Sequence, residues 1–201
     1  FLHTSPEICM KRLLAAGYSR LFQICRCFRK GERGDRHLPE MTMLEWYRTK
    51  VNYFSLMDET EALVLKVAER VGDKKAIRYN KNKIGLTRPW KRLTIEKAFS
   101  LHAGISAEKA LSEGTFDEIM AFSIEPQLGI RKPVFLYDYP VERAALARRK
   151  PENPRVAQRF ELYIGGLEIC NGFSELNDPR EQRKRFEQDR KSTRLNSSHY
   201  S

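Results

Sequence analysis

FRKGERGDRHLPEMTMLEWYR, residues Phe28 to Arg48, joins two apolar runs through a charged loop. The run before it is LFQICRCF, which ends at Phe28, and the return run is EMTMLEWYR. Gly31 and Gly34 lie in the polar stretch and allow the chain to reverse direction. This pattern predicts two antiparallel strands connected by a long charged loop.

The chemistry of this hairpin is concentrated at the base of the loop and on one strand face. Arg29 directly follows the first run, where a planar guanidinium can hold a phosphate through two parallel hydrogen bonds. The alternative is a surface arginine at a strand end. The return strand alternates, so Met41, Met43, Glu45 and Tyr47 share one face. A carboxylate and a phenol beside a phosphate clamp indicate a pocket for a cationic substrate next to a nucleotide.

Length and composition indicate one soluble domain. The chain has 201 residues, of which 41% are hydrophobic and 31% charged, and this length allows a substantial core. No apolar run approaches the roughly 18 residues of a membrane span. The first residues do not resemble a signal peptide. We therefore expect a cytoplasmic protein with no membrane segment.

The charge balance is basic. The formal net charge is +11, and it is +9 when Lys191 and Arg194 of the C-terminal tail are left out. Such an excess suits ATP and an acidic protein partner. The alternative is that the basic residues only keep the surface soluble. No segment resembles an RNA-binding module.

The four cysteines show no zinc-binding pattern by spacing. Cys25 and Cys27 point to the same side of the predicted strand, but no second pair or histidine cluster follows at ligand spacing. Together with Cys9 and Cys170 they are interpreted as buried free thiols in a reducing cytosol.

The rest of the chain predicts helices interspersed with hairpin-paired strands. Helix-starting residues stand at Ser5-Pro6-Glu7 and at Asp178, and Gly165-Gly166 predicts a tight hairpin turn. We expect an α+β fold with an antiparallel sheet flanked by helices. The expected helices cover 53–71, 95–102, 116–122 (capped by Thr115) and 178–190, the expected strands 134–139, 160–164 and 167–170, and residues 73–92 are read as a loop or weak strand.

Two carboxylates flank the predicted glycine turn. Glu161 and Glu168 are seven residues apart, a spacing that a tight hairpin can bring together on adjacent strands. Oxygen-only ligands suit Mg²⁺ shared with a triphosphate. The alternative is an exposed pair of strand carboxylates.

Several motifs, in order and spacing, resemble the class II aminoacyl-tRNA synthetases. The opening hairpin resembles motif 2 of that superfamily, and TSPE (Thr4–Glu7) and FELYIGGLEICNGFSELND (Phe160–Asp178) resemble its lysine branch. TMLEWYR, IEPQLG (Ile124–Gly129) and FLYDYPVERAALAR (Phe135–Arg148) resemble a tRNA-independent paralogue of that branch, the elongation factor P lysine ligases.

The resemblance implies a class II synthetase catalytic fold and an ATP-dependent lysine ligase. In that family the lysine carboxylate attacks the α-phosphate of ATP, which gives lysyl-adenylate, and the lysine is then transferred to a lysine of elongation factor P. ATP and Mg²⁺ are the implied cofactors, tRNA is not expected as a partner, and the full-length protein is expected to be a homodimer.

The resemblance also assigns roles to individual residues. Arg29 is the catalytic residue, in contact with the α-phosphate and the substrate carboxylate. Two positions depart from the family pattern: Gly31 replaces an acidic residue that meets the adenine, for which Glu32 can substitute, and Leu38 replaces an asparagine. Trp46, on the opposite strand face, is expected in the core. The implied ATP-binding residues are Arg29, Glu32, His37, Glu168 and Ile169, the lysine-binding residues are Ser5, Glu7, Glu45, Tyr47, Asn171 and Glu175, and the metal ligands are Glu161 and Glu168.

The expected domain organisation is a partial catalytic domain over residues 1–190, incomplete at both ends. Motif 2 is present, whereas motif 1 is expected before Phe1 and motif 3 after Asp189, so the chain alone is expected to be inactive. Residues 191–201, KSTRLNSSHYS, read as a translated sequencing adapter or a disordered tail.

Two other functions fit parts of the sequence. A lysyl-tRNA synthetase would share the catalytic motifs and would add an anticodon-binding domain before them. A non-catalytic, synthetase-like paralogue would have lost site carboxylates. Glu45, Glu161, Glu168 and Glu175 are all present, which favours an enzyme.

Overall fold

The computed structural model describes residues 2–34, 37–73 and 75–187, and these form two compact units, 1–51 and 52–201. The predicted tail at 191–201 and the predicted helix end at 188–190 lie outside the described residues. Each unit is described separately below.

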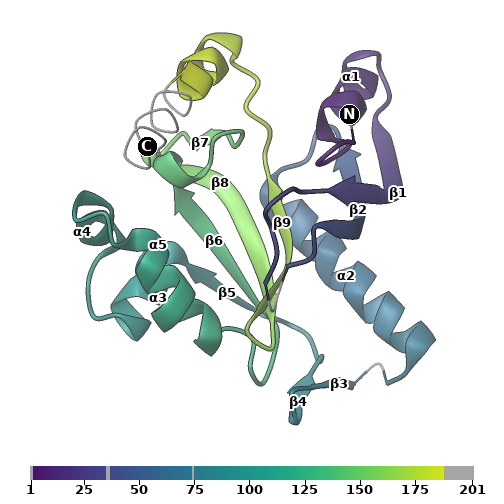
Figure 1. Ribbon diagram of the computed structural model, residues 1–201, viewed down its shortest axis with the longest axis vertical. Helices are drawn as coiled ribbons and strands as arrows, with labels where there is room; N and C mark the ends of the chain where they lie inside the picture. Colours follow the sequence, from purple (N-terminus) through teal and green to yellow (C-terminus); the bar gives the residue numbers. More distant parts are fainter. Residues whose placement is uncertain (1, 35–36, 74, 188–201) are drawn as a thin grey trace. The chain divides into compact units, whose positions relative to one another are not determined.

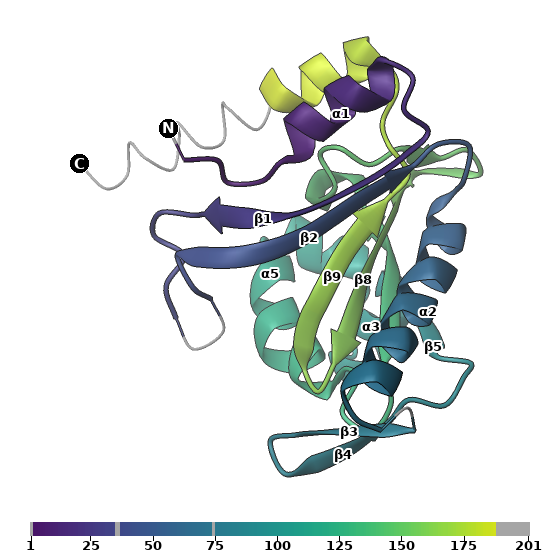
Figure 2. The same ribbon diagram turned by 90° about the vertical axis from the view of Figure 1, so that its right-hand side faces the viewer.

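The first unit is a helix followed by the predicted hairpin (Figure 1). Helix α1 covers Glu7–Ala15, and strands β1 (Arg20–Phe28) and β2 (Glu40–Arg48) pair antiparallel along their whole length. The two long strands run side by side in both views (Figure 2). The predicted hairpin is therefore confirmed.

The register of this hairpin fixes its two faces. Cys25 lies opposite Met43 and Leu21 opposite Tyr47, so the predicted face with Glu45 is confirmed. Trp46 lies on the other face, opposite Phe22, which is 73% exposed. Trp46 is half-buried, so its expected place in the core is wrong.

The second unit is built on a mixed sheet. Its strands are β5 (Lys91–Thr94), β6 (Val134–Pro140), β7 (Arg149–Lys150), β8 (Asn153–Ile164) and β9 (Leu167–Phe173), in the order β5-β6-β8-β7 with β9 also paired to β8. The pairings are antiparallel except for β5–β6, which is parallel. The α+β class is confirmed, and the sheet is mixed because β5 and β6 are joined through helices.

Helices cover both faces of this sheet (Figure 1). Alternate residues of β6 point to opposite cores: Leu136 packs with α3 (Ile95–His102), α4 (Ala107–Ser112) and α5 (Phe116–Ile119), whereas Phe135 packs with α2 (Tyr53–Val71). This alternation follows from the two-residue period of a strand. The second unit therefore has three layers, with the sheet between two apolar cores.

Three segments differ from the sequence prediction. Residues 73–92 contain a short hairpin, β3 (Ala76–Tyr79) and β4 (Asn82–Gly85), followed by β5. Helix α4 was not predicted, although Ser106 caps it through a bond from the backbone N–H of Lys109. The helix expected over 116–122 is α5 followed by the π-helix η1 (Met120–Ile124), and the Thr115 side chain does not cap it. Two short 3₁₀ turns complete the unit, η2 (Glu125–Gln127) and η3 (Val141–Arg143).

Glycines let two backbone segments approach each other closely at the β8–β9 turn. Gly165 and Gly166 both have positive φ, 64° and 78°, as the predicted tight hairpin turn requires. Gly129 packs against this end of β8, where an added Cβ would lie 2.4 Å from the carbonyl oxygen of Tyr163. The turn is fastened by a 2.9 Å hydrogen bond from the Gly165 N–H to the Gly129 carbonyl.

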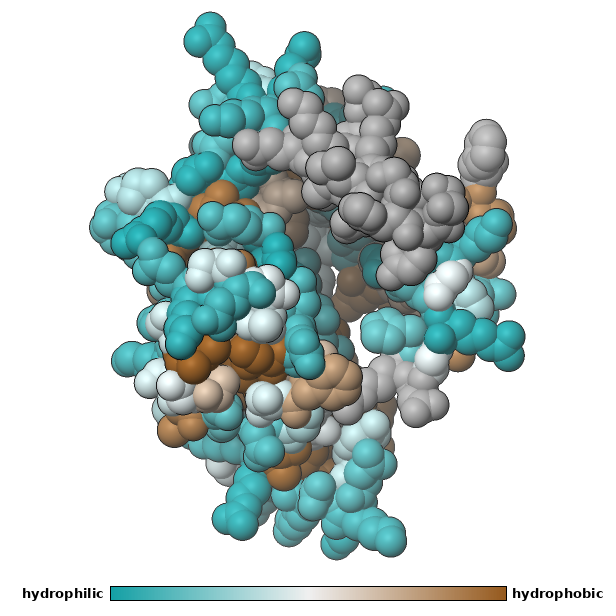
Figure 3. Space-filling model, turned by 60° about the vertical axis from the view of Figure 1, so that its left-hand side comes forward, coloured by the Kyte–Doolittle hydropathy of each residue, from teal (hydrophilic) through white to brown (hydrophobic). Residues whose placement is uncertain are grey.

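Hydrophilic residues cover most of the visible face in the space-filling view, and apolar residues gather in limited areas (Figure 3). Among the described residues, none of the helices combines the length and apolar content needed to cross a membrane.

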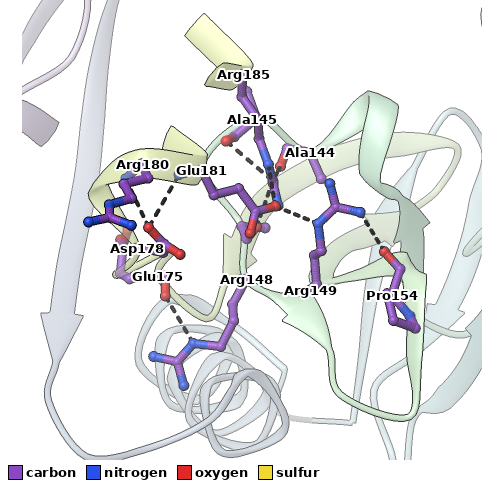
Figure 4. Close-up of polar contacts among 11 residues, drawn as sticks. Ala144, Ala145, Arg148, Arg149, Pro154, Glu175, Asp178, Arg180, Glu181 and Arg185 are labelled. Carbon is purple, nitrogen blue, oxygen red and sulfur yellow. Dashed lines mark hydrogen bonds and ion pairs between the residues drawn. The ribbon is translucent and has the colours of Figure 1, made fainter. Parts of the chain in front are cut away.

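The helical residues 179–187 are anchored to the loop before β7 by one buried arginine (Figure 4). Arg185 donates 2.8 Å hydrogen bonds to the carbonyls of Ala144 and Ala147. Glu181 accepts from Arg185 and also from Arg149. The predicted cap is confirmed, since Asp178 Oδ1 accepts a 2.8 Å bond from the N–H of Arg180.

Candidate active site

Glu45 is held at the centre of a polar cluster in the first unit. Ser5 Oγ donates a 2.8 Å hydrogen bond to Glu45 Oε2, and the Tyr47 hydroxyl donates a 2.5 Å bond to Oε1. Both carboxylate oxygens are thus oriented by hydroxyl groups, and all three residues are half-buried. A carboxylate held in this way is prepared to receive a cation.

Glu7 lies in the first turn of α1, and its carboxylate already binds an ammonium group of the chain. Lys11 Nζ lies 2.6 Å from Glu7 Oε1. The N–H of Glu7 also donates a 3.0 Å bond to Ser5 Oγ, so Ser5 connects the Glu7 turn with Glu45. Sequence reasoning missed Lys11, although the i,i+4 spacing on a helix was a usable signal.

Arg29 stands at the base of the loop between β1 and β2. Its backbone N–H donates a 2.8 Å bond to the carbonyl of Pro39, which closes the loop. Its Nε donates a 3.3 Å bond to the Thr4 carbonyl, and Nη1 lies 3.5 Å from Glu32 Oε2. The guanidinium is therefore oriented from two sides while 37% of its side chain stays exposed.

The loop itself presents two more expected nucleotide contacts. His37 is exposed and forms an isolated bridge with Gly34, with a 3.2 Å bond from the Gly34 N–H to the His37 carbonyl. Glu32 is also exposed. Both side chains lie in the same loop as Arg29, as the sequence predicted, and their roles toward ATP stay predictions.

In the second unit, Glu161 is buried in a cage of hydrogen-bond donors. Its Oε2 accepts a 2.5 Å bond from the Tyr139 hydroxyl and a 2.7 Å bond from Tyr163, and its Oε1 accepts a 2.5 Å bond from Arg159 Nη2. Burial, and then the charge of Glu161, raise the pKa of both tyrosines far above the usual range. The phenols therefore stay protonated and remain donors to the carboxylate.

Glu168 is exposed and lies on β9 of the same hairpin. The register places it opposite Tyr163 on β9, whereas Glu161 lies opposite Asn171. Tyr163 and Glu161 share a face of β8, so Glu168 lies on the same side as Glu161, across a register shift between Leu162 and Tyr163. Their joint role as metal ligands stays a prediction. Carboxylate oxygens suit Mg²⁺, and among the described residues Glu161 Oε1 accepts only the bond from Arg159, so it keeps a lone pair for an ion. Ile169, the next residue, is 49% exposed.

Asn171 is connected to Glu161 through one arginine. Arg159 Nε donates a 2.9 Å bond to Asn171 Oδ1, while its Nη2 binds Glu161. Its guanidinium carbon lies 4.5 Å from the centroid of the Tyr139 ring, within range of a cation–π contact. Sequence reasoning missed Arg159, although Arg159, Glu161 and Tyr163 alternate along one strand face.

Glu175 follows β9 and is half-buried. It forms an isolated bridge with Ala147, and its carbonyl accepts a 3.2 Å bond from Arg148 Nε. The chain before it is tightly packed, because an added Cβ at Gly172 would lie 2.5 Å from the Phe160 ring.

The predicted residues thus divide between the two units. Within each unit the structure brings several of them together: Ser5, Glu7 and Glu45 in the first, and Glu161 and Asn171, through Arg159, in the second. The first unit holds Ser5, Glu7, Arg29, Glu32, His37, Glu45 and Tyr47, and the second holds Glu161, Glu168, Ile169, Asn171 and Glu175.

The family model of the tRNA synthetases class II (D, K and N) matches residues 1–201. The chain therefore belongs to the class II tRNA synthetase family. The fold class predicted from the motifs is confirmed by this match.

Curated relatives show which members of this family the chain resembles. A protein named elongation factor P--(R)-beta-lysine ligase from Erwinia tasmaniensis is 43% identical over 195 residues, which cover 94% of this chain and 60% of the relative. Proteins of the same name from Sodalis glossinidius and Klebsiella pneumoniae are 42% and 41% identical over 211 residues, with the same coverage. The predicted resemblance is confirmed, and the chain spans 60% of the length of these relatives.

Proposed function

We propose that this chain is part of an ATP-dependent ligase that activates lysine as lysyl-adenylate and transfers it to a lysine of elongation factor P. The observation that carries the proposal is the carboxylate of Glu45, oriented by Ser5 and Tyr47. The relatives named elongation factor P--(R)-beta-lysine ligase support it at 41–43% identity. Because of their name, we extend the proposal to (R)-β-lysine as the preferred substrate.

Recognition of the substrate amine would fall to Glu45 and Glu7. A compact ammonium group offers three donors, and carboxylates in a partly dry pocket compensate its charge. Glu7 pairs with Lys11 Nζ at 2.6 Å, so the substrate amine would share the Glu7 carboxylate with Lys11 or displace it. Asn171 and Glu175, the other members of the predicted lysine-binding set, are proposed as substrate-binding residues on the resemblance alone.

Activation would take place at Arg29. The substrate carboxylate attacks the α-phosphate of ATP, pyrophosphate leaves, and the guanidinium stabilises the negative charge that develops on the phosphoryl oxygens. Its contacts to Thr4 and Glu32 hold it in place for that role. Glu168 and Glu161 would hold Mg²⁺, which neutralises triphosphate charge when bound.

Transfer would follow from the chemistry of the adenylate. The ε-amine of the acceptor lysine attacks the adenylate carbonyl, AMP leaves, and an amide bond forms. The net charge, +9 without Lys191 and Arg194 of the tail, suits an acidic acceptor protein. We also propose a cytoplasmic location and a homodimeric full-length protein, both as expected for the ligase family.

The test is a labelling experiment with the complete protein encoded by the reading frame of this chain. It receives ATP, Mg²⁺ and labelled α-lysine or (R)-β-lysine, together with purified elongation factor P or lysine tRNA. We expect label on elongation factor P, more from (R)-β-lysine, and none on a factor whose acceptor lysine is replaced by alanine. Label on the tRNA alone would establish a lysyl-tRNA synthetase instead. Absence of lysine-dependent ATP–pyrophosphate exchange would establish a non-catalytic paralogue.

A further inference from the structure

Three metal-binding side chains that have no part in the proposed reaction meet in the first unit. His3, Cys25 and Cys27 each offer one ligand atom, and these atoms lie within 4.8 Å of one another. The two sulfur atoms are 3.8 Å apart. Cys27 is buried, Cys25 is half-buried and His3 is exposed, so the group reaches from the interior of the unit to its surface.

The hairpin and the segment before α1 bring His3, Cys25 and Cys27 together. Cys25 and Cys27 are two residues apart in β1 and so share a strand face. His3 comes from the N-terminal segment, whose backbone is fastened to the end of β1. The N–H of Phe28 donates a 3.0 Å bond to the His3 carbonyl, and Arg29 Nε donates a 3.3 Å bond to the neighbouring Thr4 carbonyl.

The sulfur separation fits a tetrahedral thiolate site. With Zn–S bonds of about 2.3 Å and tetrahedral angles, two thiolates on one zinc ion lie about 3.8 Å apart. The observed separation is 3.8 Å, which matches this sulfur spacing. A set of two cysteines and one histidine leaves the fourth position for water or another ligand, and the exposed side of His3 gives access to it.

The ligand types select the class of ion. Thiolates and imidazole favour Zn²⁺ and other thiophilic metals over Mg²⁺, which prefers oxygen. Two thiolates and a neutral imidazole balance the charge of a divalent ion, so a loaded site adds no net charge beside Arg29 and Glu45. Both of these residues lie close enough to act electrostatically on Cys27.

We propose that His3, Cys25 and Cys27 form a site for a thiophilic divalent ion such as Zn²⁺. The bound ion fastens residues 3–5 to strand β1. Because Ser5 in this segment donates to Glu45, occupancy also rigidifies the cluster of Ser5, Glu45 and Tyr47. The site goes beyond the proposed ligase function and does not depend on it.

The test is a titration of the full chain with Co²⁺ in the presence of a reductant that does not bind metal. Tetrahedral thiolate-bound Co²⁺ gives a charge-transfer band in the near ultraviolet and d–d bands in the visible range. We expect one Co²⁺ per chain, displaced by one Zn²⁺. Cys25→Ser should weaken binding at least about 100-fold, since loss of outer-shell groups alone costs 10–100-fold. His3→Ala, at an exposed position, should weaken it in the same direction.

Two cysteines outside the group provide matched controls. Cys9 is exposed on α1, and Cys170 lies in the second unit; the variants Cys9→Ser and Cys170→Ser should keep the Co²⁺ spectrum and its stoichiometry. Zn²⁺ should raise the thermal midpoint of the parent chain and of Cys9→Ser, but not that of Cys25→Ser. An unchanged spectrum in Cys25→Ser, or no thiolate band in the parent chain, would overturn the proposal.

Discussion

Ser5 Oγ lies 2.8 Å from Glu45 Oε2, although forty residues separate the two in the sequence. The contact couples the segment that starts α1 to the return strand of the hairpin. Since Ser5 Oγ also accepts a 3.0 Å bond from the Glu7 N–H, one hydroxyl orients two carboxylate-bearing residues. The proposed amine pocket is therefore assembled from two segments rather than presented by one strand.

Replacing Glu45 by glutamine should weaken lysine binding selectively. The substitution removes the negative charge but keeps the shape, and a hydrogen bond to a charged group is worth about 1.5–3 kcal/mol, or roughly 10- to 150-fold in KM for lysine. Ser5→Ala should also raise the KM for lysine, but by a smaller factor, because Tyr47 still orients the Glu45 carboxylate. ATP–pyrophosphate exchange at varied lysine concentration measures both. An unchanged KM for lysine in Glu45→Gln would refute the pocket.

Replacing Arg29 by alanine should slow adenylate formation without unfolding the protein. Loss of one preorganised charged donor costs roughly 100-fold or more in rate, whereas the side chain is 37% exposed and contributes little to the core. The matched control is Arg26→Ala in the preceding strand β1, where the Arg26 side chain is 67% exposed and pairs with Glu40. Single-turnover kinetics and thermal melting separate the two effects. A near-normal rate in Arg29→Ala would contradict the phosphate-binding role.

The two expected metal ligands should respond differently to the same change. Glu168→Gln removes a charge at an exposed position, so we expect a higher Mg²⁺ requirement and a smaller loss of stability than in Glu161→Gln. Glu161→Gln places an amide among three donors, which should cost about 1–3 kcal/mol of stability in addition. Magnesium titrations of pyrophosphate exchange, combined with urea unfolding, measure both quantities. Unchanged magnesium titrations in both variants would count against a metal site.

The sequence was most informative where local pattern and local structure agree. Helix α2 covers Tyr53–Val71 as predicted, because Asn52 caps its start and Gly72 follows its end. The hairpin was predictable because alternation and loop glycines both indicate it. By contrast, the parallel pairing of β5 with β6 joins two short segments that are distant in the chain, and no local pattern reports such a pairing.

The sequence predicted a set of site residues but not the contacts that hold them. The motif order indicated Glu45 and Glu161, yet their partners Ser5 and Tyr139 come from other segments. Similarly, cysteine spacing alone argued against a metal group. The third ligand, His3, reaches Cys25 only through the folded first unit. Tertiary proximity of this kind has no signature in the spacing of residues.

The buried Arg185 makes the stability of the second unit sensitive to acid. Burial alone would raise the pKa of Glu181, but hydrogen bonds from Arg185 and Arg149 dominate and lower it below its usual value of 4.5. A carboxyl group with a lowered folded-state pKa stabilises the protein fully above its unfolded pKa, and this contribution is lost as the pH falls through the folded value. We therefore expect Glu181→Gln to be less stable than the parent by about 1–3 kcal/mol at pH 7.

Urea unfolding between pH 7 and pH 3 tests whether acid removes the stabilisation that Glu181 provides. The difference between the parent and Glu181→Gln should be constant at neutral pH and shrink below about pH 4.5, because protonation removes the same charge that the variant lacks. The matched control is Glu108→Gln, whose ion pair with Arg155 has side chains 77% and 78% exposed and should contribute close to nothing. A stability difference that persists undiminished at pH 3 would show that the glutamine acts through packing and not through the ion pair with Arg185.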